Sequence, residues 1–233
     1  YERIQPVYLL KNTKDECKTF EEYTEHIKEK QVDKDGNTVF LYSNNPEADH
    51  GVIQKAEKRG FDVLEMSTPL TAHLLQHFET KMDKVQFKRV DADALDKLIP
   101  KADAVESNLT SDQKEMLTPM IQGVLDKETF VIQFESLDET DQPMMITQSE
   151  FMRRMKEQAE IGGGMFGMSN MPESYNLVVN SNHPLFSKLL IEQDEGKRGA
   201  MVQQATDLAL LGKGMLKGEK LTRFIERSTE LIG

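Results

Sequence analysis

A chain of 233 residues can form one large domain or two of ordinary size, and 38% hydrophobic residues are enough for a packed core. No run approaches the roughly 20 apolar residues that span a bilayer. A net charge of -11 argues against nucleic acid as a partner, because phosphate groups would repel an acidic chain. The single cysteine, Cys17, cannot form an intrachain disulfide. We therefore expect a cytoplasmic protein with neither nucleic acid nor a membrane as a partner.

The first hundred residues alternate predicted helices with predicted strands. Thr19 and Glu22 have the spacing of a capping box, which predicts a helix over residues 20–31. Strands are predicted at 38–42, 61–66 and 85–90, with helices at 47–60 and 69–82. Alternation at these lengths implies right-handed crossovers between parallel strands. The predicted fold over residues 1–100 is therefore an α/β three-layer unit with a short parallel sheet.

The second half has a different pattern. Residues 101–110 are polar and aperiodic, which predicts a linker before an α+β domain over 111–233. Apolar runs at 129–137 and 143–147 flank an acidic turn and predict an antiparallel hairpin. A further strand is predicted at 175–180, and helices are predicted from 111 and at 149–161, 183–190, 200–212 and 219–232. The domain is predicted to end in an antiparallel helix pair.

Two patterns match part of a ligand-binding motif, but neither motif is complete. Gly162, Gly164 and Gly167 match the spacing of a dinucleotide-binding loop, but they follow a helix instead of a strand. His73 and His77 lie four residues apart on one helix, a spacing that can bind metal, but no third ligand is apparent. We therefore assign no catalytic, cofactor-binding or metal-binding residue.

Residues 160–174 place large apolar side chains on a glycine-rich stretch, which is costly to order. Methionine is concentrated from residue 144 to residue 171. Its unbranched, polarizable side chain suits surfaces that must fit several partners. The alternative is that these methionines fill an irregular core.

The last two predicted helices carry apolar residues at helical spacing. Two such helices form half of a four-helix bundle, and symmetric pairing of two copies would give a two-fold dimer. The alternative is that they pack onto their own domain. The predicted interface residues are Met201, Val202, Ala205, Leu208, Ala209, Leu211, Leu221, Phe224, Ile225, Leu231 and Ile232.

Several stretches together resemble a known family. They are TFEEYTEHIKEKQ (19–31), TVFLYSNNPEA (38–48), residues 56–99, NSNHPLFSKLL (180–190) and the terminal helices. They are similar to the ninety-kilodalton heat-shock chaperones, specifically the bacterial HtpG branch. The resemblance implies the last part of the middle domain followed by the C-terminal dimerisation domain. The sequence begins YERIQ, without methionine, which predicts a piece of a longer protein.

The resemblance also implies a function. The chain would be the non-catalytic portion of an ATP-dependent chaperone that assists protein folding, a homodimer that contacts unfolded or partly folded clients. ATP and Mg would bind upstream, so we expect no cofactor and no ATPase activity here. The implied client-contact residues are Met152, Met155, Met165, Phe166, Met168 and Met171. The alternative is a small-ligand-binding or enzymatic α/β domain with an accessory α+β domain, since residues 43–49 follow a strand at the edge where parallel sheets bind ligands.

Overall fold

A computed structural model describes residues 9–68, 71–100, 106–149, 153, 174–230 and 232, without the side chains of 71–74 and 76. Two compact units divide the chain: Tyr1–Ala104 with Gln148–Met171, and Val105–Thr147 with Pro172–Gly233. Residues 148–171 were predicted to belong to the second domain, whereas the described residues of that segment, Gln148, Ser149 and Arg153, belong to the first unit. The other predicted limits, with a linker at 101–110 between the two domains, remain predictions.

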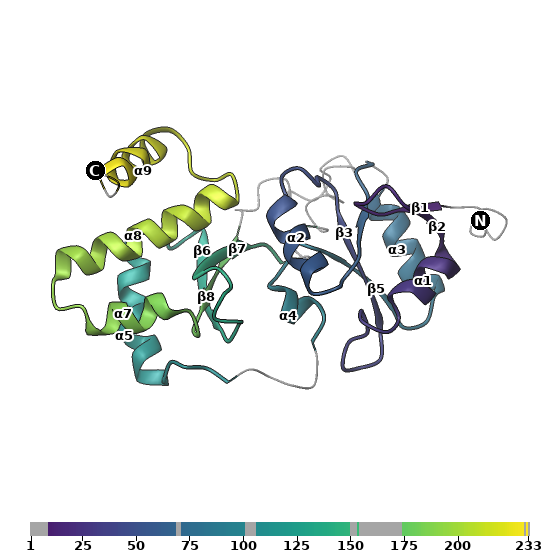
Figure 1. Ribbon diagram of the computed structural model, residues 1–233, viewed down its shortest axis with the longest axis horizontal. Coiled ribbons are helices and arrows are strands. Elements are labelled where there is room, and N and C mark those ends of the chain that lie inside the picture. Colours follow the sequence, from purple (N-terminus) through teal and green to yellow (C-terminus); the bar gives the residue numbers. More distant parts are fainter. Residues whose placement is uncertain are drawn as a thin grey trace. The chain divides into compact units, whose positions relative to one another are not determined.

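The first unit contains the predicted parallel sheet (Figure 1). Its strands are β3 (Thr38–Ser43), β4 (Val63–Glu65) and β5 (Val85–Arg89), in the order β4-β3-β5. Both neighbours are parallel to β3. All residues of β3 except the first are buried, as expected for a strand covered on both faces.

Four helices of this unit supply that cover. They are α1 (Phe20–Ile27), α2 (His50–Lys58), α3 (Thr71–Lys81) and α4 (Leu95–Leu98). Phe40 and Tyr42 of β3 share an apolar cluster with α1 and α3, whereas Val39 and Leu41 share another with α2 and α4. Alternate side chains of the central strand therefore enter two different cores.

The predicted capping box is present at the start of α1. The Thr19 hydroxyl accepts the Glu22 N–H, and the Glu22 carboxylate accepts the Thr19 N–H. A two-stranded antiparallel hairpin, β1 (Leu9–Lys11) and β2 (Cys17–Thr19), precedes this helix and was not predicted. Each strand has three residues, too few to show an alternating pattern.

The second unit has a mixed sheet in the order β6-β8-β7. Its strands are β6 (Phe130–Glu135), β7 (Met144–Thr147) and β8 (Tyr175–Asn180). The predicted hairpin between β6 and β7 is wrong, because β8 lies between them, parallel to β6 and antiparallel to β7. The central position suits β8, whose consecutive residues Leu177 and Val178 are both buried.

Buried amides close the turn after β8. The side chain of Asn180 donates to the Asp138 carbonyl at 2.8 Å and accepts the Leu137 N–H at 3.3 Å. The side chain of Asn182 accepts the Asn108 N–H at 2.7 Å and donates to the carbonyls of Glu106 and Leu137, each at 3.0 Å. These bonds join the segment before α5 to the end of the sheet.

The helices of the second unit pack against one apolar cluster with this sheet. They are α5 (Ser111–Gln122), α7 (Pro184–Ile191), α8 (Glu195–Gly212) and α9 (Gly218–Glu230). Thr110 caps α5, and this helix continues through Pro119. The predicted helix at 149–161 lies outside the described residues except for Ser149 and the helical Arg153, whose N–H donates to the Ser149 carbonyl at 3.0 Å.

The cap of α7 predicts a dependence of stability on pH. His183 Nδ1 accepts the Leu185 N–H at 3.1 Å, which requires a neutral ring. Burial, and then the charge of Lys188, lower the pKa of His183 from its ordinary value of 6.5. The contribution to stability is therefore complete above pH 6.5 and is lost as the pH falls through the lowered pKa.

We expect the free energy of unfolding to be lower at pH 5.5 than at pH 7.5. His183→Asn keeps a capping acceptor without a titrating ring, so it should reduce that difference. Urea unfolding of both proteins at both pH values, followed by circular dichroism, measures it. Equal differences in the two proteins would contradict the assignment.

Candidate functional site

The predicted client-contact residues fall outside the described part of the chain. They are Met152, Met155, Met165, Phe166, Met168 and Met171. Their role stays a prediction. The predicted functional residues that the structure describes lie on and after the two terminal helices, α8 and α9.

The predicted interface residues separate into two groups by exposure. Val202, Ala205 and Ala209 are buried in the core of their own unit, and Met201, Leu221 and Phe224 are half-buried against it. By contrast, Leu208 is 50% exposed, Leu211 42%, Ile225 54% and Ile232 88%. Leu231 lies outside the described side chains. The exposed residues are the ones that can meet a partner in this conformation.

Helix α9 has an unusual burial pattern for an amphipathic helix. Leu221, Phe224 and Ile225 follow helical spacing, yet none of the residues Gly218–Glu230 is buried. Most helical stability in proteins comes from packing an apolar face. The apolar face of α9 is only partly covered within its own chain.

Polar contacts hold α9 on α8, and sequence analysis missed them. Arg227 donates to the carboxylate of Asp207 at 2.6 Å and to the side-chain oxygen of Gln204 at 2.8 Å. Gln204 also donates to the Ser228 hydroxyl at 3.1 Å, and Gln203 donates to Asp207 at 2.9 Å. We call these five residues the α8–α9 polar junction. The available signal was Asp207 itself, an acidic residue within the apolar face of α8.

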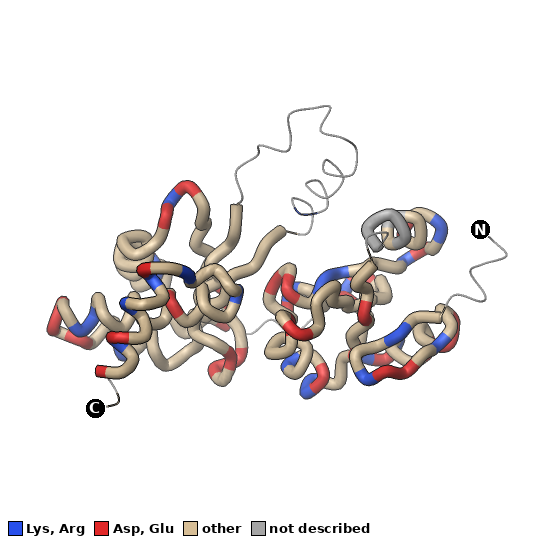
Figure 2. The backbone as a smooth tube through the Cα atoms, turned by 90° about the horizontal axis from the view of Figure 1, so that it is seen from above, with Lys and Arg blue, Asp and Glu red and all other residues tan. Residues whose placement is uncertain are grey.

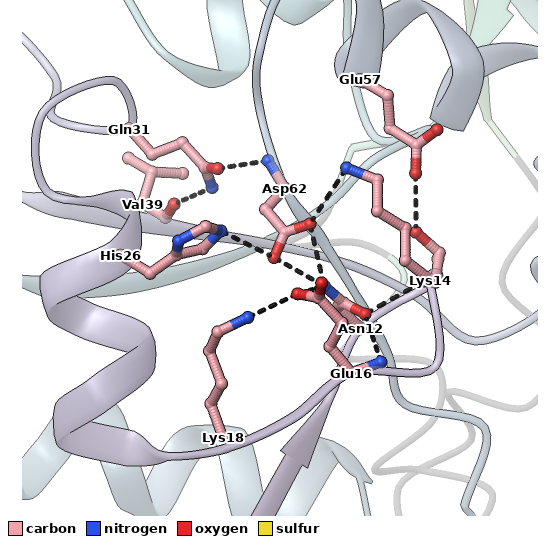
Figure 3. A network of polar contacts seen from close by, with 10 residues as sticks. Asn12, Lys14, Glu16, Lys18, His26, Gln31, Val39, Glu57 and Asp62 are labelled. Carbon is pink, nitrogen blue, oxygen red and sulfur yellow. Dashed lines mark hydrogen bonds and ion pairs between the residues drawn. The ribbon is translucent and has the colours of Figure 1, made fainter.

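A second polar cluster surrounds Asp62 in the first unit (Figure 3). The Asp62 carboxylate, 7% exposed, accepts two hydrogen bonds from Asn12 at 3.1 and 3.2 Å. Lys14 and His26 lie 3.8 and 3.7 Å from it. The Asp62 N–H donates to Gln31 at 2.6 Å.

This cluster also acts on Tyr23. Burial, and then the charge of Asp62, raise the pKa of the Tyr23 hydroxyl far above its ordinary value. Asn12 directly follows β1, and Asp62 directly precedes β4. The cluster therefore fastens the hairpin to the sheet, and its carboxylate is occupied by structural partners.

The described residues were also compared with the requirements of a metal site and of a membrane-spanning helix. They contain no group of three or more His, Cys, Asp and Glu side chains that could hold a metal ion. No described helix is both long and apolar enough to cross a bilayer. Figure 2 shows acidic and basic residues interspersed along both units.

Comparison with known proteins places the chain in a family. The family described as Hsp90 protein matches residues 7–222. Chaperone protein HtpG of Bacteroides thetaiotaomicron is 33% identical over 299 aligned residues, covering 100% of this chain and 44% of that protein. Those of Bacteroides fragilis strain YCH46 and Porphyromonas gingivalis strain W83 are 32% and 28% identical, with the same coverage.

The chain belongs to the Hsp90 protein family. Its resemblance to the HtpG branch is confirmed by relatives that match it over its whole length. The chain spans less than half the length of these relatives. The matched span of 299 exceeds the 233 residues of this chain, so these relatives carry insertions relative to it.

The α8–α9 polar junction predicts a large effect from one arginine and a small effect from its neighbour. Arg227→Met leaves the Asp207 carboxylate, 5% exposed, without its cation. We expect the free energy of unfolding to fall by about 2–3 kcal/mol, less than for a fully buried pair because Arg227 is 24% exposed.

Arg223→Met is the matched control, since Arg223 pairs with Glu219 on the same helix and the two side chains are 72% and 76% exposed. Its cost should stay under about 1 kcal/mol. Urea unfolding measures both variants. Equal costs would show that Asp207 does not depend on Arg227.

Proposed function

We propose that this chain is the non-catalytic portion of an ATP-dependent molecular chaperone. It forms a homodimer through α8 and α9 and presents a surface for unfolded or partly folded client proteins. ATP and Mg would bind to a region outside this chain, which would have no ATPase activity of its own. The proposed location is the cytoplasm, in keeping with a single cysteine.

One observation carries the dimer proposal. Helix α9 has an apolar face and no buried residue, yet it is held in a defined place by the α8–α9 polar junction. A second copy of the same surface would cover Leu208, Leu211 and Ile225 and would form a closed two-fold interface. The two terminal helices of each copy would then make a four-helix bundle.

Dimerisation would also serve client binding. Burying one Met or Phe side chain on a client contributes about 1.5–3 kcal/mol before ordering costs are subtracted. Each protomer alone would bind weakly and reversibly. Two protomers facing one client would raise the effective concentration of contact surface.

The alternative, a small-ligand-binding or enzymatic α/β domain, is not favoured by the family match. The two proposals differ in what a titration would detect. Nucleotides and common cofactors should give no saturable binding to this chain. Saturable binding of any of them would restore the alternative.

The dimer proposal predicts unequal effects from two exposed isoleucines. Ile225→Asp should raise the dissociation constant at least about 100-fold, because each substitution occurs twice in a two-fold interface. Ile191→Asp, on α7 of the same unit, is the matched control, since Ile191 is 74% exposed and lies outside the proposed interface. We expect a change of less than about threefold, within the usual effect of a surface substitution.

Sedimentation equilibrium over a wide concentration range measures both constants. A monomeric parent chain, or equal effects of the two substitutions, would refute the interface.

The client-contact proposal is tested with a double substitution, Met165→Ala with Phe166→Ala. Losing two apolar side chains should weaken binding of an unfolded protein by at least about tenfold. Met116→Ala is the control, because Met116 is a methionine on α5 that is 53% exposed and is not one of the proposed client-contact residues. Fluorescence anisotropy with labelled, carboxymethylated lactalbumin reports the affinity. Unchanged affinity in the double variant would remove these residues from the contact surface.

A further inference from the structure

Buried and half-buried polar side chains gather where the parallel strands of the first unit end. Ligands of open parallel sheets usually bind at this edge. Strand β3 ends with Tyr42 and Ser43, and β5 ends with Arg89. Asp49 and Asp91 follow these two strands in the sequence. We call these five residues the strand-end cluster.

The members of this cluster are paired with one another. Arg89 donates two parallel hydrogen bonds to Asp91, and the two side chains are 14% and 8% exposed. The Ser43 hydroxyl donates to Asp49 at 2.6 Å and accepts the Asn45 N–H at 3.1 Å. Paired groups of this kind are the usual way to hold charge away from water.

Arg153 reaches this cluster from a distant part of the sequence. Its guanidinium Nη2 donates to the Tyr42 hydroxyl at 2.6 Å, and the residue is 8% exposed. The bond joins residues 111 positions apart. A buried arginine is rare unless it is paired, and the Tyr42 hydroxyl is one of the partners of Arg153.

The charges of this cluster also act on one another. Burial disfavours a charged Arg89, but the hydrogen bonds and charge of Asp91 outweigh it, so the pKa of Arg89 is raised. Arg153 acts to lower the pKa of Arg89, and Asp49 acts to raise it. Two guanidinium groups therefore share this edge of the sheet with two carboxylates.

We propose that the strand-end cluster is a socket for Arg153, and that Arg153 is a positioning residue for the proposed client-contact residues next to it, Met152 and Met155. The socket lies at the edge where open parallel sheets usually bind ligands. Its occupant is a side chain of the same chain. The functional half of the proposal rests on the proposed client contacts, because Met152 and Met155 flank Arg153 in the sequence.

The chemistry of the socket suits arginine better than lysine. A guanidinium is a planar fork with five donors, whereas an ammonium is a compact and strongly hydrated point charge. Tyr42 supplies a neutral acceptor with a fixed position, since it is 2% exposed and packs in the apolar cluster that contains residues of α1 and α3. Because the Tyr42 hydroxyl is neutral, it can bind Arg153 while the two arginines of this edge stay balanced by the two aspartates.

The first test measures how firmly Arg153 is held. Tyr42→Phe removes the accepting hydroxyl and keeps the ring in the core. Cleavage of the full chain by trypsin after Arg153, followed by mass spectrometry, should become about tenfold faster, as expected for loss of one charge-assisted hydrogen bond. Tyr23→Phe is the matched control, because Tyr23 is 1% exposed in the same apolar cluster. Equal cleavage rates in the two variants would overturn the socket.

The second test separates positioning from general stability. We expect Tyr42→Phe and Arg153→Lys to weaken binding of carboxymethylated lactalbumin about fivefold or more, with Tyr23→Phe unchanged. If cleavage accelerates but affinity is unchanged, Arg153 is anchored without positioning the client contacts, and that half of the proposal fails. If the parent chain does not bind the unfolded protein, the proposed function fails, while the cleavage result still decides the socket.

Discussion

A charge buried without a partner costs about 3–5 kcal/mol, and this chain meets that constraint by joining segments that are distant in sequence. Asp62 is paired with Asn12 across 50 positions, and Asp207 with Arg227 across 20. Arg153 is paired with Tyr42 across 111 positions. Apolar burial determines which faces turn inward, but it is non-directional and does not choose between neighbouring placements. We infer that these polar pairs fix where the hairpin, helix α9 and Arg153 lie.

The placement of α9 shows how such a pair bears on the proposed dimer interface. A helix with no buried residue would gain little from its own chain if only apolar contacts held it. The bond from Arg227 to Asp207 holds α9 while leaving Ile225 exposed. Apolar surface that is positioned in advance costs less to bury in a dimer, because ordering has already occurred. The polar junction and the exposed residues are therefore two parts of one proposed interface.

The sequence predicted the first unit better than the second. Residues 38–42 form a continuous apolar run, and such a run identifies a strand buried on both faces without knowledge of its neighbours. The pairing partners of the strands in the second unit were not predicted correctly. The turn at 138–142 favoured a local hairpin, but the partner of both strands was β8, some 30 residues further on. The hairpin β1–β2 was too short to leave a periodic signal.

The limits on predicting the site have the same physical origin. Helical spacing identified Val202, Ala205 and Ala209 as an apolar face, but it cannot distinguish a residue that packs in its own core from one that meets a partner. Ser43 and Asp49 were noted only because parallel sheets bind ligands where their strands end. What that edge holds depends on whether its charges are already paired, and Arg153 enters the cluster from a segment that no local pattern connects to it. The position of an edge in the fold is therefore weak evidence for a ligand site. Whether the buried charges at that edge are already paired is a stronger criterion.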